Sequence, residues 1–203
     1  EAPARPAYTV PLHKGTLVKV IKDKEITSSS VKIISKFPHR QERTLGDLKR
    51  SVANLLYTYM VNQRLTEVAQ HKDAPFMYAQ SYASGGSGNT DRYMSLASVK
   101  GDQILEGTKG LMRELLRIKQ YGFSQAELDR KKEILYNDFE RMAQEEDKMT
   151  SAQIMEAISN HVVYGEENAS ISFKKAFVQQ VLNEITLNDI QALVNEYINQ
   201  SDD

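Results

Sequence analysis

The sequence predicts an α+β fold in which helices cover one face of a mostly antiparallel sheet of five or six strands. Two observations support this prediction. Stretches of alternating apolar residues come first and in neighbouring pairs, and helical apolar spacing dominates the second half of the chain. Residues 1–14 begin with a Pro- and Ala-rich stretch and are expected to be an interdomain connector, while residues 15–203 are expected to form a single domain.

Four segments alternate as half-buried strands do, namely residues 16–22, 31–37, 76–83 and 93–99. We expect the first two to open the domain as neighbouring strands. The last two flank residues 84–89, which are rich in Gly and Ser, so they are expected to form a hairpin with a loop longer than two residues.

Helical spacing of apolar residues covers about 44–70, 102–122 and the segment that follows Ser124. Three shorter helical stretches follow, centred on Ile158, Val181 and Val194. Ser or Thr followed three residues later by an acidic residue is typical of a helix N-terminus. Such pairs occur at Thr44/Asp47, Ser124/Glu127 and Thr186/Asp189.

The composition excludes several classes of function. The 26 Lys and Arg are balanced by 27 Asp and Glu, so no nucleic-acid partner is expected. The absence of cysteine excludes thiol chemistry, and no apolar run approaches the ~20 residues of a transmembrane helix. The chain opens at Glu1 in a connector-like stretch, which favours a piece of a longer protein.

No self-contained active site is expected in this chain. None of the four histidines has another within four residues, so the HExxH and HxxEH zinc motifs are both absent. No GxSxG nucleophile elbow occurs. The Gly-rich residues 84–89 lack the phosphate-binding patterns and do not open a helix. We therefore predict no catalytic residue and no metal ligand.

Three stretches resemble one known family. They are Val61–Gln70 continuing into Asp73–Phe76, then Tyr121–Lys131, which is similar to "G-[FI]-[ST]-x-x-E-L-x-x-[AR]-K", and Leu182–Ile190, which is similar to "I-T-x-x-D-[IV]". Their order and spacing resemble the non-zinc-binding second domain of long bacterial pitrilysin/insulinase (inverzincin) zinc metallopeptidases. The resemblance covers nearly the whole chain.

The resemblance implies that zinc is bound by HxxEH in another domain, and that a partner domain supplies an Arg and a Tyr seven residues apart. Here those two positions are occupied by Ala69 and Phe76. Neither side chain can donate a hydrogen bond to an oxyanion. If the alignment slips, Tyr78 becomes the hydroxyl, but His71 then stands where the Arg is required.

Phe76, Tyr78 and Tyr82 are candidate contacts for a peptide in the channel that the resemblance implies. The alternative is that they belong to the core, since alternating aromatic residues on a strand more often pack inside.

The resemblance implies a catalytically inactive domain of a zinc metalloendopeptidase, which helps to enclose a peptide-binding chamber. Its partners would be the zinc-binding domain of the same polypeptide and the peptide substrate. Zinc would belong to the parent protein, with no cofactor in this chain, and the setting would be the bacterial periplasm or cell envelope. The alternative is a structural scaffold module, as in relatives that have lost activity.

Overall fold

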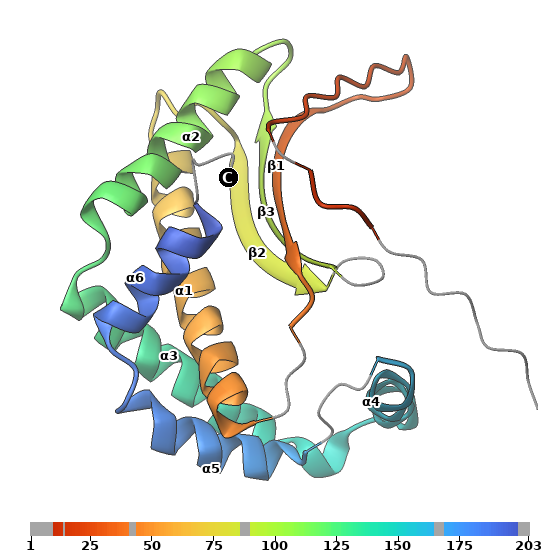
Figure 1. Cartoon of the computed structure of the whole chain (residues 1–203), viewed down its shortest axis with the longest axis vertical. Coiled ribbons are helices and arrows are strands. Elements are labelled where there is room, and N and C mark those ends of the chain that lie inside the picture. The colour runs from red at the N-terminus through yellow and green to blue at the C-terminus, as the bar shows by residue number, and fades with distance from the viewer. Residues whose placement is uncertain (1–9, 14, 41–43, 86–89, 165–168, 199–203) are drawn as a thin grey trace, which may run out of the picture. The chain divides into compact units, whose positions relative to one another are not determined.

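A computed structural model describes residues 10–13, 15–40, 44–85, 90–164 and 169–198. Along the chain the elements are β1 (Ser29–Pro38), α1 (Leu45–Ala69), β2 (Tyr78–Gly85), β3 (Thr90–Val99), α2 (Ile104–Tyr121), α3 (Gln125–Gln144), the short 3-10 helix η1 (Glu146–Lys148), α4 (Ser151–Tyr164), α5 (Ile171–Leu182) and α6 (Leu187–Tyr197) (Figure 1). They divide into two compact units. Unit 1 holds residues 1–40, 61–122 and 193–203, and unit 2 holds residues 41–60 and 123–192.

Unit 1 contains an antiparallel sheet in the order β1-β3-β2. The α+β class is confirmed, but the prediction of five or six strands is wrong, because the sheet in the described residues has three. Strands were found at three of the four expected segments. The hairpin of β2 and β3 is confirmed by its register, from Tyr78 opposite Ser98 to Gly85 opposite Asp91, while residues 86–89 of its loop lie outside the described residues.

The predicted strand at residues 16–22 is absent from the sheet, and β1 pairs with β3 instead. In this segment Leu17 and Ile21 fall on one side of an extended chain, and Val18 and Val20 fall on the other. All four side chains are largely exposed. The alternation therefore defines no single buried face, and a strand with no buried face has no burial to fix its pairing in a sheet.

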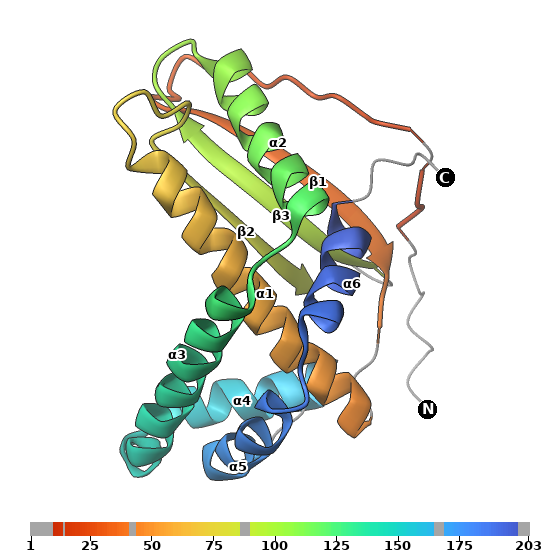
Figure 2. The same cartoon turned by 90° about the vertical axis from the view of Figure 1, so that its left-hand side faces the viewer.

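Helices of unit 1 lie on one face of the sheet, as Figures 1 and 2 show for α2 and for the end of α6. Two glycines let α2 approach closely. A Cβ on Gly107 would overlap the side chain of Val99, and one on Gly110 would overlap the ring of Pro75. At the end of α6 the ring of Tyr197 stacks on Tyr93, with centroids 4.6 Å apart. This packing buries one face of β3.

Helix α1 closes the outer edge of β2 through one side chain. Asn62 Nδ2 donates to the carbonyl of Ser81 at 3.1 Å, and the Ser81 amide donates to Asn62 Oδ1 at 2.7 Å. Ser81 lies opposite Ser95, and their hydroxyls are 2.7 Å apart. Asn62 thus supplies the donor and acceptor that a neighbouring strand would otherwise provide.

Unit 2 consists of helices whose starts are set by capping. The predicted boxes at Thr44/Asp47, Ser124/Glu127 and Thr186/Asp189 are all formed, since each hydroxyl accepts from the third residue and each carboxylate accepts from the cap amide. A fourth box joins Thr150 to Gln153. These bonds satisfy amides that have no partner within the helix.

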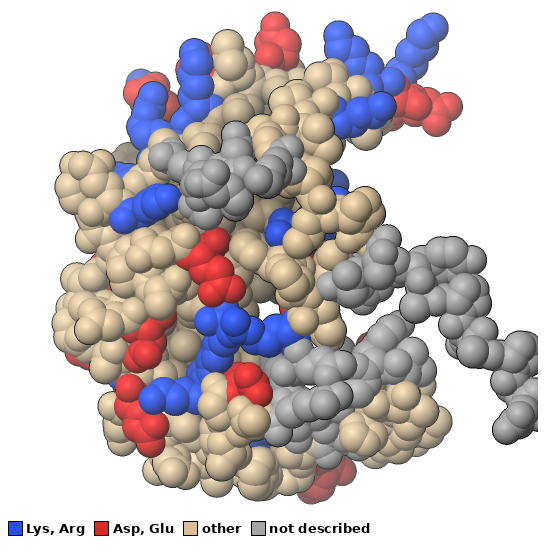
Figure 3. Space-filling model, viewed as in Figure 1, with Lys and Arg blue, Asp and Glu red and all other residues tan. Residues whose placement is uncertain are grey.

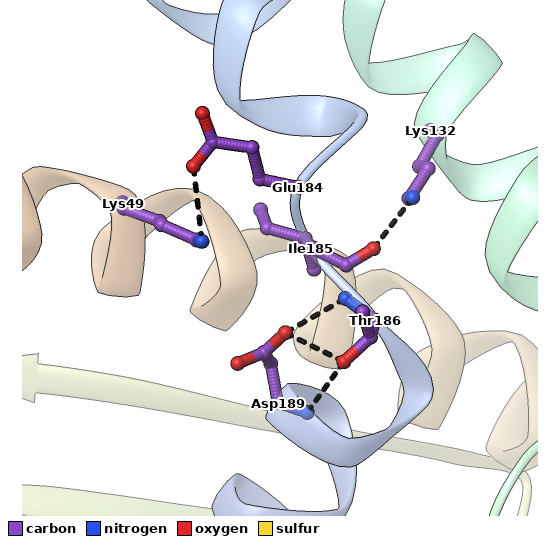
Figure 4. Close-up of polar contacts among 6 residues, drawn as sticks. All are labelled: Lys49, Lys132, Glu184, Ile185, Thr186 and Asp189. Atoms are coloured by element: carbon purple, nitrogen blue, oxygen red, sulfur yellow. Dashed lines mark hydrogen bonds and ion pairs between the residues drawn. The ribbon is translucent and has the colours of Figure 1, made fainter.

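The connection between α5 and α6 is tied to two other helices of unit 2 (Figure 4). Lys132 on α3 donates to the carbonyl of Ile185 at 2.6 Å, and Lys49 on α1 is 3.1 Å from Glu184. The Ile185 side chain is buried. At the other end of α5, the carboxylate of Glu146 accepts from the amides of Ile171 and Ser172.

Candidate functional site: the uncovered face of the sheet

The face of the sheet that points away from α2 and Tyr197 is the candidate site. Residues directly opposite one another in an antiparallel pair project from the same face, so the strand register identifies its members. We call this set the uncovered face: Ser30, Lys32, Ile34, Lys36, Pro38, Tyr78, Gln80, Tyr82, Ser84, Thr90, Arg92, Met94, Leu96 and Ser98.

An apolar row crosses the centre of the uncovered face. Ile34 on β1 lies opposite Met94 on β3, and Met94 lies opposite Tyr82 on β2. Ile34 is 49% exposed, whereas Met94 on the central strand is 8% exposed. An apolar side chain half open to water on a sheet face is a ready contact for another apolar group.

Cationic side chains flank this row. Lys32 lies in the row on one side, while Lys36 and Arg92 lie opposite each other in the row on the other side. All three are exposed, and Arg92 Nε donates to Ser84 Oγ at 3.0 Å. The uncovered face contains no Asp or Glu. In the view of Figure 3, basic and acidic residues lie interspersed.

The three aromatic residues predicted to contact a peptide differ in their exposure to solvent. Tyr78 is 50% exposed on the uncovered face, where its hydroxyl is hydrogen-bonded to Gln80, and Tyr82 lies two residues further along the same strand. Phe76 is 2% exposed and belongs to the core. Ala69, the other family position, is the last residue of α1. One family position therefore ends α1 and the other lies in the connection before β2, and neither brings a hydrogen-bonding side chain.

No group of three His, Asp or Glu side chains suited to a metal ion forms within the described residues. After the end of β1, His39 Nδ1 is 2.8 Å from Asp91 Oδ1 on β3. Among the helices in the described part of the chain, none is both long and apolar enough to cross a membrane.

The fold is shared with known proteases. The chain is 22% identical over 190 residues to a zinc protease PQQL-like protein of Arabidopsis thaliana, covering 94% of this chain and 17% of that protein. The first half of the periplasmic protease PqqL from Escherichia coli superposes with a TM-score of 0.81 at 16% identity, covering 90% of this chain and 39% of that one. A peptidase M16 inactive domain from Pseudomonas fluorescens gives a TM-score of 0.58 at 18% identity, covering 85% and 38%. No family model matches the chain.

The predicted resemblance to the pitrilysin/insulinase family is confirmed. The chain spans about a sixth of its curated relative and less than half of each solved structure compared above. The zinc protease PQQL-like protein therefore has further chain beyond the part that this sequence matches.

The stretches that carry the pitrilysin/insulinase resemblance have structural roles here. Gly122 has a positive φ of 62° and its amide closes the end of α2, directly before the Ser124/Glu127 box. Thr186 and Asp189 start α6, and Asn62 closes the edge of β2. The recognisable residues therefore specify the fold, and the chemistry of the candidate site comes from other residues.

Sequence reasoning missed the cationic members of the uncovered face. Alternation in residues 31–37 placed Val31, Ile33 and Phe37 on the buried side, so it also implied that Lys32 and Lys36 point away from the core. It did not reveal that β1 pairs with β3, which is what brings Arg92 beside Lys36.

Proposed function

We propose that residues 15–203 act as one catalytically inactive domain of a longer zinc-dependent metalloendopeptidase, and that the uncovered face lines its peptide-binding chamber. Residues 1–14 would connect this domain to the preceding one. The single observation that supports the proposal best is the fold shared with part of the first half of the protease PqqL and with part of a peptidase M16 inactive domain.

The zinc and the catalytic groups would come from another domain of the parent protein. With alanine and phenylalanine at the two family positions, this chain has no side chain there to polarise a carbonyl or to stabilise an oxyanion. Its contribution to proteolysis would be to enclose the peptide and to contact it through Tyr78 and Tyr82. The description of PqqL as a periplasmic protease supports a periplasmic or cell-envelope setting for the bacterial parent.

The test is to recover the natural polypeptide with antibodies raised against this chain, and to measure its mass, zinc content and hydrolysis of unfolded peptides. We expect a longer polypeptide with bound zinc, whose activity is lost with a chelator and restored by zinc. A natural polypeptide without zinc or peptidase activity would contradict the proposal and favour the scaffold alternative.

A second measurement tests the role of the face. In the active natural polypeptide, Tyr82→Ser should raise KM for peptide hydrolysis while the zinc content stays unchanged. Tyr121→Ser is the matched control, because Tyr121 is 74% exposed at the end of α2 and does not belong to the uncovered face. Equal kinetics for the two variants would contradict a peptide-lining role.

A further inference from the structure

We propose that the uncovered face selects extended peptide segments in which two acidic side chains flank an apolar one. The inference rests on the proposed function, since it names the class of peptide that this face would contact.

The charge of the face supports this selectivity. Lys32 and Lys36 form no ion pair within the described residues, whereas Lys49 pairs with Glu184 and Lys175 pairs with Glu140. The chain as a whole is nearly neutral, with a formal net charge of −1. The uncovered face, with three cationic side chains and no carboxylate, is therefore more positive than the chain as a whole. This charge favours an anionic partner.

The spacing of the face defines the pattern of that partner. Lys32 and Lys36 are four residues apart on one strand, which corresponds to about 13 Å at ~3.3 Å per residue. Ile34 lies midway between them and leads into Met94 and Tyr82. An extended peptide presents every second side chain to one side. Acidic groups at its positions i and i+4 would thus meet the lysines, and an apolar group at i+2 would meet the central row.

The experiment measures binding of short fluorescent peptides to the 203-residue chain by anisotropy. The probe peptide has the pattern Glu–Ser–apolar–Ser–Glu. One analogue has glutamine in place of both glutamates, and the other has lysine in place of both. We expect the acidic peptide to bind about 2- to 30-fold more tightly than the glutamine analogue at low salt, as two exposed ion pairs would give. The lysine analogue should bind most weakly, and added salt should reduce the differences.

Two double variants locate the effect. Lys32→Glu with Lys36→Glu should abolish or invert the preference for the acidic peptide. Lys19→Glu with Lys22→Glu makes the same change in charge on the exposed segment outside the sheet, and it should leave the preference intact. Circular dichroism and thermal unfolding establish that each variant is folded.

The outcomes separate the two proposals. Equal binding of all three peptides, reduced by Tyr82→Ser, would overturn the charge preference and leave the peptide-lining role supported. A preference that survives in the Lys32/Lys36 variant would overturn the assignment to this face. Binding of no peptide would overturn both proposals. Equal competition by a single-stranded oligonucleotide of the same charge would mean a generic polyanion surface and would overturn the peptide selectivity.

Discussion

The bidentate bond between Asn62 and Ser81 makes a single side chain responsible for an edge of the sheet. Replacing Asn62 with alanine leaves the amide and carbonyl of Ser81 without these partners. Losing the partners of buried polar groups costs about 1–3 kcal/mol each, so we expect Asn62→Ala to lower the free energy of unfolding by at least that amount.

Chemical denaturation measures the effect of this substitution. Asn62→Asp keeps the acceptor for the Ser81 amide but places a carboxylate oxygen against the Ser81 carbonyl, so at neutral pH it should be at least as destabilising as Asn62→Ala. The control is Gln63→Ala, which removes a neighbouring exposed amide that is bonded to Glu67. If Asn62→Ala were no more destabilising than Gln63→Ala, the bond would have no part in holding β2.

Gly110 provides a second test at the scale of one residue. In an exposed helix, changing glycine to alanine stabilises by about 1 kcal/mol. At Gly110 the new methyl group would overlap the ring of Pro75, so we expect a net loss of about 1–3 kcal/mol instead. Thermal unfolding gives the sign of the change.

Two further variants establish the cause of that loss. Gly46→Ala, in the first turn of α1, meets Thr44 only at an ordinary 3.5 Å and should be neutral or stabilising. Pro75→Ala should recover part of the loss when it is combined with Gly110→Ala. If the changes in unfolding free energy of the two substitutions were strictly additive, this would argue against an overlap between residue 110 and Pro75.

At the scale of elements, helix starts are where sequence and structure agree best. A capping box is local, because the residues that form it lie three apart, and so the sequence predicts it without knowledge of the fold. The sheet depends on pairing between distant segments. Residues 16–22 and 31–37 both alternate, yet only the second finds a partner, and alternation alone carries no information about pairing.

The difference between local and long-range patterns also explains which residues of the candidate site could be predicted from the sequence. Tyr78 and Tyr82 could be named as candidates from the sequence of one strand, because residues four apart on a strand share a face. The grouping of Lys32, Lys36 and Arg92 requires the register between two strands that are distant in sequence. Phe76 precedes β2 and is buried, although its aromatic character in the sequence is the same as that of the two tyrosines.

Two carboxylates at helix starts make stability depend on pH. Hydrogen bonds from Ser172 and from the Ile171 amide lower the pKa of Glu146 below its ordinary 4.5. For Asp189, burial would raise the pKa, but bonds from Thr186 and the charge of Lys49 outweigh it, so its pKa is lowered below 3.8. Because folding lowers both pKa values, these groups contribute their full stability above the unfolded values, and the contribution is lost as pH falls through the folded ones.

We therefore expect the free energy of unfolding to fall as pH drops below about 4. Asp189→Asn should be less stable at neutral pH and should show a shallower acid dependence. The control is Asp73→Asn, at an exposed position in the turn after α1, which should keep the slope of the parent chain. Denaturant titrations across the acid range measure both slopes, and identical slopes in the three proteins would contradict the role of Asp189.

At the scale of the whole molecule, we predict the zinc content and the peptidase activity of the isolated chain. The purified chain, dialysed against micromolar zinc and then against buffer, should retain less than one zinc per chain and should cleave no peptide, since the described residues bring no ligand set together. Elemental analysis by mass spectrometry measures the zinc. One tightly bound zinc per chain, lost in His71→Ala or His161→Ala, would contradict the inactive-domain proposal.

The Asn62 amide also occupies the place where a strand from another molecule would pair with β2. Sheet edges with free amides and carbonyls are templates for intermolecular strand pairing, which leads to aggregation. By bonding Ser81 on both its donor and its acceptor, α1 protects this edge for as long as the helix stays folded. We therefore expect fibril formation by the concentrated protein to depend on the integrity of a helix that contributes no strand to the sheet.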